Sequence, residues 1–158
     1  MIIRKAQKAD LKYLCELHAR SVNASARDFY TDSEIEAWAC KDPRCYEKHL
    51  EEQAIFIGED SYIRGFCIVK LKLSQLVALY VAPEHTRAGY GIALLKFCEE
   101  LTVNQGSFKL LTYSSLNAVS FYKQNGFVEL GLHIIRMGAV DLRCVKMSKN
   151  LTSSSLIS

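Results

Sequence analysis

The chain of 158 residues has no long apolar run, no cluster of basic residues and little net charge. No segment approaches the roughly 18 apolar residues that a membrane span needs, so we expect no membrane partner. The first residues, M-I-I-R-K, are not followed by the apolar stretch of a signal peptide, which predicts a cytoplasmic location. The 20 basic and 17 acidic side chains give a formal charge of +3 without a Lys/Arg block, so we expect no nucleic-acid partner.

The 6 cysteines lack the C-x-x-C spacing that marks zinc ribbons. They are scattered, mostly inside apolar stretches, so the sequence predicts no disulfide framework. Cys40, Cys45 and His49 form a partial metal set. Structural zinc is nearly always four-coordinate, and a fourth ligand is not evident, so we expect no metal.

The length suits one domain with a single core, and 49% hydrophobic and 23% charged residues are typical of globular proteins. We expect one domain over residues 1–149. The serine-rich end predicts a flexible C-terminal tail over residues 150–158.

Hydrophobic periodicity predicts the order β-α-α-α-β-β-β-α-β-α-β-β, an α/β (α+β) arrangement. The expected strands are residues 2–5, 54–58, 62–71, 73–81, 108–113, 127–136 and 140–146. Asp10 is the expected cap of a first helix that ends near residue 21, and Thr31 or Asp32 caps a short second helix. Further helices are expected at residues 43–51, 90–104 and 117–125.

The most informative segment is V-A-P-E-H-T-R-A-G-Y-G-I-A, residues 81–93, which runs from a strand through a turn into an amphipathic helix. Gly89 and Gly91 let a ligand approach the backbone, and the helix N-terminus offers free N–H groups and partial positive charge. The segment therefore predicts a pyrophosphate cradle, with Arg87 as a further cationic contact. It is not a P-loop, because no Gly-Lys-Ser/Thr follows, and it lacks the third glycine of the dinucleotide fingerprint.

Two motifs resemble the GNAT superfamily of acetyl-CoA-dependent N-acetyltransferases. R-x-x-G-x-G-x-A after V-x-P resembles motif A, which grips the CoA pyrophosphate, and S-L-N-A-V-S-F-Y-K-Q-N-G-F resembles motif B. The two motifs occur in the order typical of the family. The resemblance implies the GNAT fold, a central mixed, mostly antiparallel, twisted sheet of about seven strands flanked by four to five helices. It also implies acetyl-CoA as co-substrate.

The resemblance further implies which residues hold the co-substrate. The backbone of the strand before the cradle pairs with the pantetheine amides, and one N–H there polarises the thioester carbonyl. The residues expected to bind acetyl-CoA are Leu79, Tyr80, Val81, Arg87, Ala88, Gly89, Tyr90, Gly91, Ile92, Ala93, Asn117 and Tyr122.

Tyr122, in the second motif, is the predicted catalytic residue. Acetyl transfer expels CoA as a thiolate, and a phenol of pKa near 10 is protonated at neutral pH and can donate to the sulfur. The alternative is a buried aromatic side chain on an amphipathic helix. Asn117 stands where a helix N-cap is expected, and it either caps only or also contacts the co-substrate, as the family pattern favours.

The sequence leaves several candidates for the general base. Glu34, Glu36, His133 and Gln75 (through water) are the alternatives. Family members often carry an acidic residue on the strand before motif A, whereas this chain has Ser74 and Gln75 there. The expected acceptor-site residues are Phe29, Tyr30 and Trp38, which alternatively form a hydrophobic cluster that closes the sheet.

The predicted function is N-acetyl transfer from acetyl-CoA to a primary amine of a small molecule or protein, by direct attack in a ternary complex. The alternative is a non-catalytic acyl-CoA sensor, which would keep the cradle but need no Tyr122. A third reading is transfer of another acyl group, such as succinyl. The sequence is also compatible with a homodimer that forms through the last strands or an exposed sheet edge.

Overall fold

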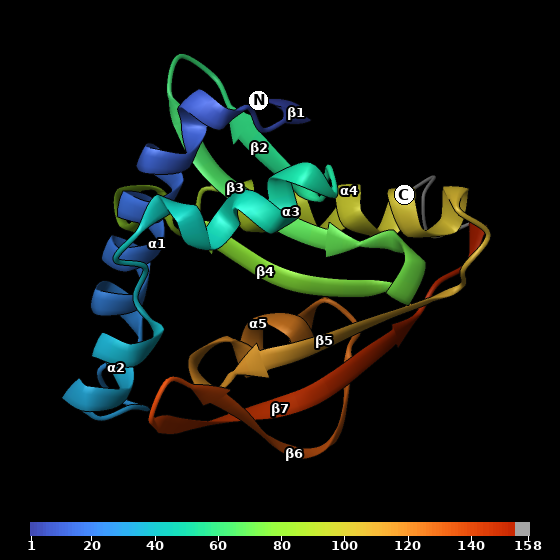
Figure 1. Cartoon of the computed structure of the whole chain (residues 1–158). Helices are drawn as coiled ribbons and strands as arrows, with labels where there is room; N and C mark the ends of the chain where they lie inside the picture. The colour runs from blue at the N-terminus through green and yellow to red at the C-terminus, as the bar shows by residue number, and fades with distance from the viewer. Residues whose placement is uncertain (154–158) are drawn as a thin grey trace.

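The computed structural model describes residues 1–153, which contain one seven-stranded sheet of order β1-β2-β3-β4-β5-β7-β6 (Figure 1). Every neighbouring pair is antiparallel except β4 and β5, which are parallel. The predicted mixed, mostly antiparallel sheet is therefore confirmed. The strands are β1 (Ile2–Lys5), β2 (Ile55–Glu59), β3 (Ile63–Lys70), β4 (Gln75–Val81), β5 (Lys109–Ser115), β6 (Val128–Met137) and β7 (Val140–Asn150).

Helices cover both faces of this sheet. In the described residues they are α1 (Leu11–Ser25), α2 (Asp32–Trp38), α3 (Glu47–Glu51), α4 (Tyr90–Asn104) and α5 (Val119–Gln124). Short 3₁₀ turns precede or join several of them. Among residues 1–153, no helix has the length and apolar character to cross a membrane.

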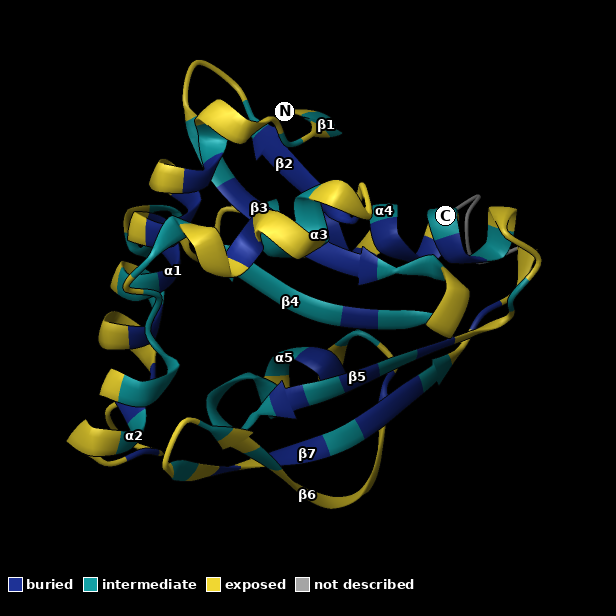
Figure 2. Ribbon diagram, viewed as in Figure 1, coloured by how far each residue is buried: buried dark blue, intermediate teal, exposed yellow. Residues whose placement is uncertain are grey.

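β3 is buried on both faces, so it contributes to two of the three hydrophobic clusters in the described residues. Phe66 and Ile68 point into the cluster under α1, whereas Cys67 and Val69 point into the cluster under α4 and α5. Successive strand side chains alternate between faces, so a strand sandwiched between helices is apolar at every position. Figure 2 shows β2 and β3 buried and the outer sides of the helices exposed.

The cap predicted for α2 is confirmed, whereas the cap predicted for α1 is not. Thr31 caps α2 as predicted: its Oγ1 accepts from Glu34 N (3.2 Å), and Glu34 Oε1 accepts from Thr31 N (2.9 Å). Asp10 makes no side-chain cap bond to α1. Its carboxylate instead accepts from Gln7 N (2.7 Å) and pairs with Arg4 (2.9 Å), because a 3₁₀ turn precedes the helix.

The C-terminal strand is longer than predicted, since β7 continues to Asn150. Leu151 is buried, and its N–H donates to Phe108 O (2.7 Å), so the ordered chain reaches beyond the expected start of the tail at residue 150. Residues 154–158 of that predicted tail lie outside the described residues.

A disulfide joins Cys15 of α1 to Cys40, just after α2, with the Cα atoms 5.2 Å apart. Sequence spacing did not predict it, because the two residues are 25 positions apart and meet only when α2 packs against α1. The thiol of Cys45 lies 3.2 Å from Cys40 Sγ. This disulfide ties the chain after α2 to the first helix.

Candidate functional site

β4 and β5 separate after a short stretch of pairing. The pairing ends at Leu76 and Thr112 in the described residues. A β-bulge on β4 follows at Val77, between the pairs that β3 makes with Leu76 and Ala78. A bulge bends its strand. The backbone of residues 77–81 therefore has no strand partner on its β5 side within residues 1–153.

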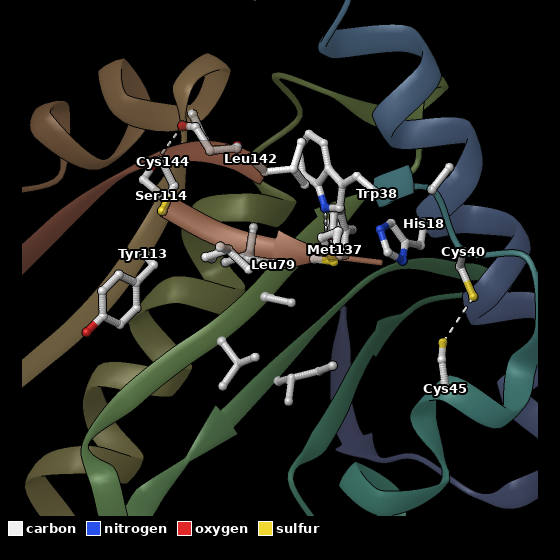
Figure 3. Close-up of a pocket in the computed structure, with 18 of the residues that line it drawn as sticks. His18, Trp38, Cys40, Cys45, Leu79, Tyr113, Ser114, Met137, Leu142 and Cys144 are labelled. Carbon is white, nitrogen blue, oxygen red and sulfur yellow. Dashed lines mark hydrogen bonds between the residues drawn. The ribbon is translucent and has the colours of Figure 1, made fainter. Parts of the chain in front are cut away.

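The separation opens a cavity of about 560 Å³, a volume typical of small-molecule sites. One end is lined by residues 77–80 of β4, residues 112–115 of β5 and Tyr122 of α5. The other end lies at α1, α2 and the segment after α2. There, Figure 3 shows His18 and Trp38 near Cys40. The cavity thus joins a free strand edge to a second compartment.

The glycine turn builds the start of α4. Gly89 is the N-cap residue, with a φ of 87° that favours glycine. The chain enters this turn at Arg87, whose φ of 64° is also left-handed. The N–H of Ala93 donates to Gly89 O (3.0 Å), so the N–H groups of residues 90–92 precede the helical ladder. Three neighbouring donors at a helix N-terminus suit an anionic group.

The side chains around this turn differ in their pairing. Tyr90 Oη donates to Asp60 (3.0 Å), and Asp60 also pairs with Arg64 (2.9 Å), which contacts His85. Arg87 is exposed and has no ion pair among residues 1–153. It is therefore the side chain at the turn whose charge is left for a ligand.

Gly91, in the first turn of α4, is not required by the backbone. It does not have a positive φ, and a Cβ there would meet Phe121 and Val81 at 3.6 Å, which is ordinary van der Waals contact. Glycine inside a helix costs about 1 kcal/mol relative to alanine. The fold alone would favour alanine at this position, whereas close approach of a ligand to the backbone would favour glycine.

Asn117 is not the helix cap that the sequence predicted. It lies inside a 3₁₀ turn (Leu116–Ala118), and α5 begins after Ala118 without a side-chain cap. The reason is that this turn continues β5 directly and takes up the residues before the helix. Asn117 Nδ2 donates to Ser25 Oγ (3.3 Å), while its buried Oδ1 has no partner in the described structure.

Tyr122 lines the cavity and also belongs to the core. Its ring packs edge-on against Phe121 and Phe127, both at 5.2 Å between centroids. Burial raises the pKa of the Tyr122 phenol well above its usual value, and a side-chain hydrogen bond with Thr112 opposes that shift only in part. The phenol is therefore protonated at neutral pH, as a proton donor must be.

The three expected acceptor-site residues separate in the structure. Tyr30 and Trp38 line the cavity, whereas Phe29 is 47% exposed and does not line it. The Tyr30 hydroxyl donates to Arg143 O (2.6 Å) and accepts from Leu116 N (2.9 Å). These bonds fix the ring between α2 and β7.

None of the four side chains named as possible bases lines the cavity. Glu34 serves the α2 cap, Glu36 pairs with Lys41 (3.4 Å), and His133 packs on Tyr113 at 4.5 Å between ring centroids. Gln75 lies in the paired part of β4. The expected set therefore does not meet at the site.

His18 is a titratable residue of the cavity for which the sequence indicated no role. It lines the cavity from the apolar face of α1, is 9% exposed, and shares a hydrogen bond between Nδ1 and Tyr46 Oη (2.5 Å). Its Nε2 has no hydrogen-bond partner in the described structure. Burial lowers the pKa of His18 to about 4. A histidine at helical spacing among Leu11, Leu14 and Cys15 was the available signal.

A metal centre is not evident in the described part of the chain. Within residues 1–153, no group of three or more His, Cys, Asp or Glu side chains is placed to hold a metal ion. The partial set of Cys40, Cys45 and His49 therefore does not make one.

The motifs and the fold agree with a family model described as an acetyltransferase (GNAT) domain, which matches residues 17–151. The chain belongs to this family, and it is a GNAT-type N-acetyltransferase. The predicted family and enzyme class are thereby confirmed.

Individual proteins show the same relationship. The chain is 31% identical over 140 residues to a spermidine N(1)-acetyltransferase of Thermoplasma acidophilum, covering 79% of this chain and 86% of the relative. A GCN5-related N-acetyltransferase structure from Rhodopseudomonas palustris superposes with a TM-score of 0.89 at 24% identity, covering 95% of each chain. PaiA N-acetyltransferase of Thermoplasma acidophilum, solved with coenzyme A, superposes with a TM-score of 0.71 at 23% identity, covering 94% and 98%.

Proposed function

We propose that the protein transfers acetyl from acetyl-CoA, held where β4 and β5 separate, to a primary amine in the compartment beside α1 and α2. The observation that carries this proposal is the unpaired edge of residues 77–81, whose last residue, Val81, lies beside Gly91 in the first turn of α4. A pantetheine arm has amides that can pair with such an edge, as an added strand does. Its pyrophosphate then reaches the α4 N–H groups and Arg87.

The contacts along this path follow from the chemistry of each position. The backbone of Leu79, Tyr80 and Val81 pairs with the amides, and one of these N–H groups polarises the thioester carbonyl. Residues 87–93 hold the pyrophosphate through backbone N–H groups and the Arg87 charge. Asn117 Oδ1 is buried and has no partner in the described structure, and we propose that this side chain turns toward the co-substrate and accepts from one of its N–H groups.

The reaction needs one proton acceptor and one proton donor. The amine nitrogen attacks the thioester carbon and loses a proton, and the C–S bond then breaks so that CoA leaves as a thiolate. We assign the acceptor role to His18, which is neutral at pH 7 and has a free Nε2 when Nδ1 donates to Tyr46. Tyr122 donates to the departing sulfur, giving the amide and free CoA.

The non-catalytic sensor is the competing function, and Tyr122→Phe separates the two. We expect this variant to bind acetyl-CoA like the wild type and to release thiol at least tenfold more slowly, since general acid catalysis is worth about 10²–10⁴-fold. Thiol release is followed with saturating amine, and binding by calorimetry. Unchanged thiol release in the variant would refute the role of Tyr122. Binding without any amine-dependent release by the wild type would favour the sensor.

The acceptor is a primary amine of a small molecule or protein. The name of one relative, a spermidine N(1)-acetyltransferase, supports an amine acceptor. Acetyl is the proposed acyl group, and succinyl-CoA offered in the same thiol-release assay tests that choice. A faster rate with succinyl-CoA would overturn it.

We also propose that two copies associate through the outer edge of β6. This edge strand exposes Val128, Leu130, Leu132 and Ile134 by 51–80%. Long apolar edge strands are a liability that proteins normally cover, and a second copy would cover this one. Light scattering should give twice the 17.9 kDa chain mass, and Leu132→Lys should give the monomer mass. A monomeric wild type would refute the pairing.

A further inference from the structure

The acceptor compartment is walled by five aromatic rings: His18 of α1, Tyr30, Trp38 of α2, Tyr46 and Tyr80 of β4. These rings contact one another through hydrogen bonds and ring packing. Trp38 Nε1 donates to Tyr80 Oη (3.0 Å), Tyr80 stacks on His18 at 4.3 Å, and Tyr30 meets Trp38 edge-on at 5.5 Å. The stacking covers one face of Tyr80 and one of His18. Fixed rings with few open polar groups suit an apolar or aromatic ligand body.

The charged groups that line the cavity do not favour a polycation. Asp42 is its one carboxylate among the described residues. The Arg44 guanidinium donates twice to Asp42 Oδ2 (2.6 and 2.8 Å), and Arg44 N donates to Oδ1 (2.9 Å). These bonds lower the pKa of Asp42 and offset its charge. Within residues 1–153, no cavity-lining carboxylate is therefore left free for a second ammonium.

The basic lining residues are Lys41 and Arg143. Lys41 pairs with Glu36 (3.4 Å) outside the cavity. Arg143 has no ion pair within residues 1–153. Its positive charge nevertheless contributes to lowering the pKa of Glu34. Glu34 is engaged with Thr31 N (2.9 Å). The lining at the α2–β7 side of the compartment therefore carries a positive charge, whereas the ionised carboxylate of Glu34, which interacts with Arg143, lies outside the lining.

Resting on the proposed function, we propose that the acceptor is a primary monoamine with an apolar or aromatic body, and that Arg143 excludes polyamines. The aromatic walls receive the body, and the reacting nitrogen lies toward the β4 edge. A second ammonium would lose its hydration without a partner carboxylate and would face a like charge. Arg143 is thus a specificity-determining residue.

The test compares 2-phenylethylamine with spermidine as acceptors, by kcat/KM for thiol release from acetyl-CoA. We expect the wild type to prefer 2-phenylethylamine by at least tenfold. Arg143→Glu should shift that ratio at least tenfold toward spermidine, because it replaces a repelling charge by an attracting one. Lys146→Glu is the matched control: it makes the same charge change on β7 at a residue that does not line the cavity, and the ratio should stay as in the wild type.

Two results would overturn the proposal: a wild type that prefers spermidine, or an Arg143→Glu ratio that does not move. Thermal shift by each amine in the presence of CoA provides a readout that does not need turnover. If acetyl-CoA binds but neither amine is acetylated, the proposed function fails. In that case the thermal shift alone decides the acceptor class. Stronger stabilisation of the CoA-bound protein by spermidine than by 2-phenylethylamine would overturn the proposed acceptor class.

Discussion

Replacing Gly91 by alanine should stabilise the protein and weaken its binding of acetyl-CoA. The Cβ has room, since its nearest neighbours would be Phe121 and Val81 at 3.6 Å. Alanine in a helix is favoured over glycine by about 1 kcal/mol. For a chain of this size that corresponds to a rise of about 2–4 °C in the unfolding temperature. The same methyl group would lie where we place the pyrophosphate, so we expect binding to weaken at least tenfold, or about 1.4 kcal/mol.

Two assays on the same samples separate these effects, namely thermal unfolding without ligand and calorimetric titration with acetyl-CoA. Gly89→Ala is the control with the opposite effect on stability. Its φ of 87° strains any side chain, so it should lower the unfolding temperature while also weakening binding. Lys96→Ala, on the exposed side of α4, should change neither property appreciably. A Gly91→Ala protein that binds acetyl-CoA like the wild type would refute the close approach.

Two further changes test groups that line or frame the cavity. His18→Gln should slow amine acetylation at least tenfold. Burial lowers the pKa of His18 to about 4, so the fold favours its neutral form, and between pH 7 and pH 4 the free energy of unfolding should fall by about 3 kcal/mol more in the wild type than in the variant. An equal loss in the variant would contradict this, as measured by urea unfolding. Cys15→Ser should cost about 3 kcal/mol, since the disulfide to Cys40 closes a loop of 25 residues. Dithiothreitol should destabilise the wild type but not this variant, and a wild type indifferent to reductant would refute the cross-link's contribution.

The sequence predicted the order of strands and helices, because periodicity reports which face of an element is buried. It also predicted the mixed sheet through its two motifs. The predicted ends of the strands and helices were less accurate than their order. β7 extends to Asn150 because its pairing with β5 continues to Lys109, which a short sequence window does not reveal. Asn117 looked like a cap, but the 3₁₀ turn places α5 two residues later.

One part of the candidate site could likewise be predicted from the sequence, and another part could not. The glycine turn could be found because it is local, with Gly89, Gly91 and Arg87 in one short segment. The compartment beside α1 could not, because it combines His18, Trp38 and Arg143 from three distant elements. The spread of β4 from β5 arises from a bulge at Val77, which depends on pairing with β3 rather than on composition. The disulfide likewise depends on how α2 packs on α1.

Calorimetric titration of acetyl-CoA into the wild type, Arg87→Glu and Lys12→Glu tests whether the glycine turn binds the co-substrate. Arg87 is exposed at the proposed cradle and has no ion pair within residues 1–153, whereas Lys12 is exposed on α1, and the charge change is the same in both. We expect saturable binding of one acetyl-CoA per chain, at least tenfold weaker in Arg87→Glu and unchanged in Lys12→Glu. Absence of binding by the folded wild type, or equal affinity in all three proteins, would contradict this expectation.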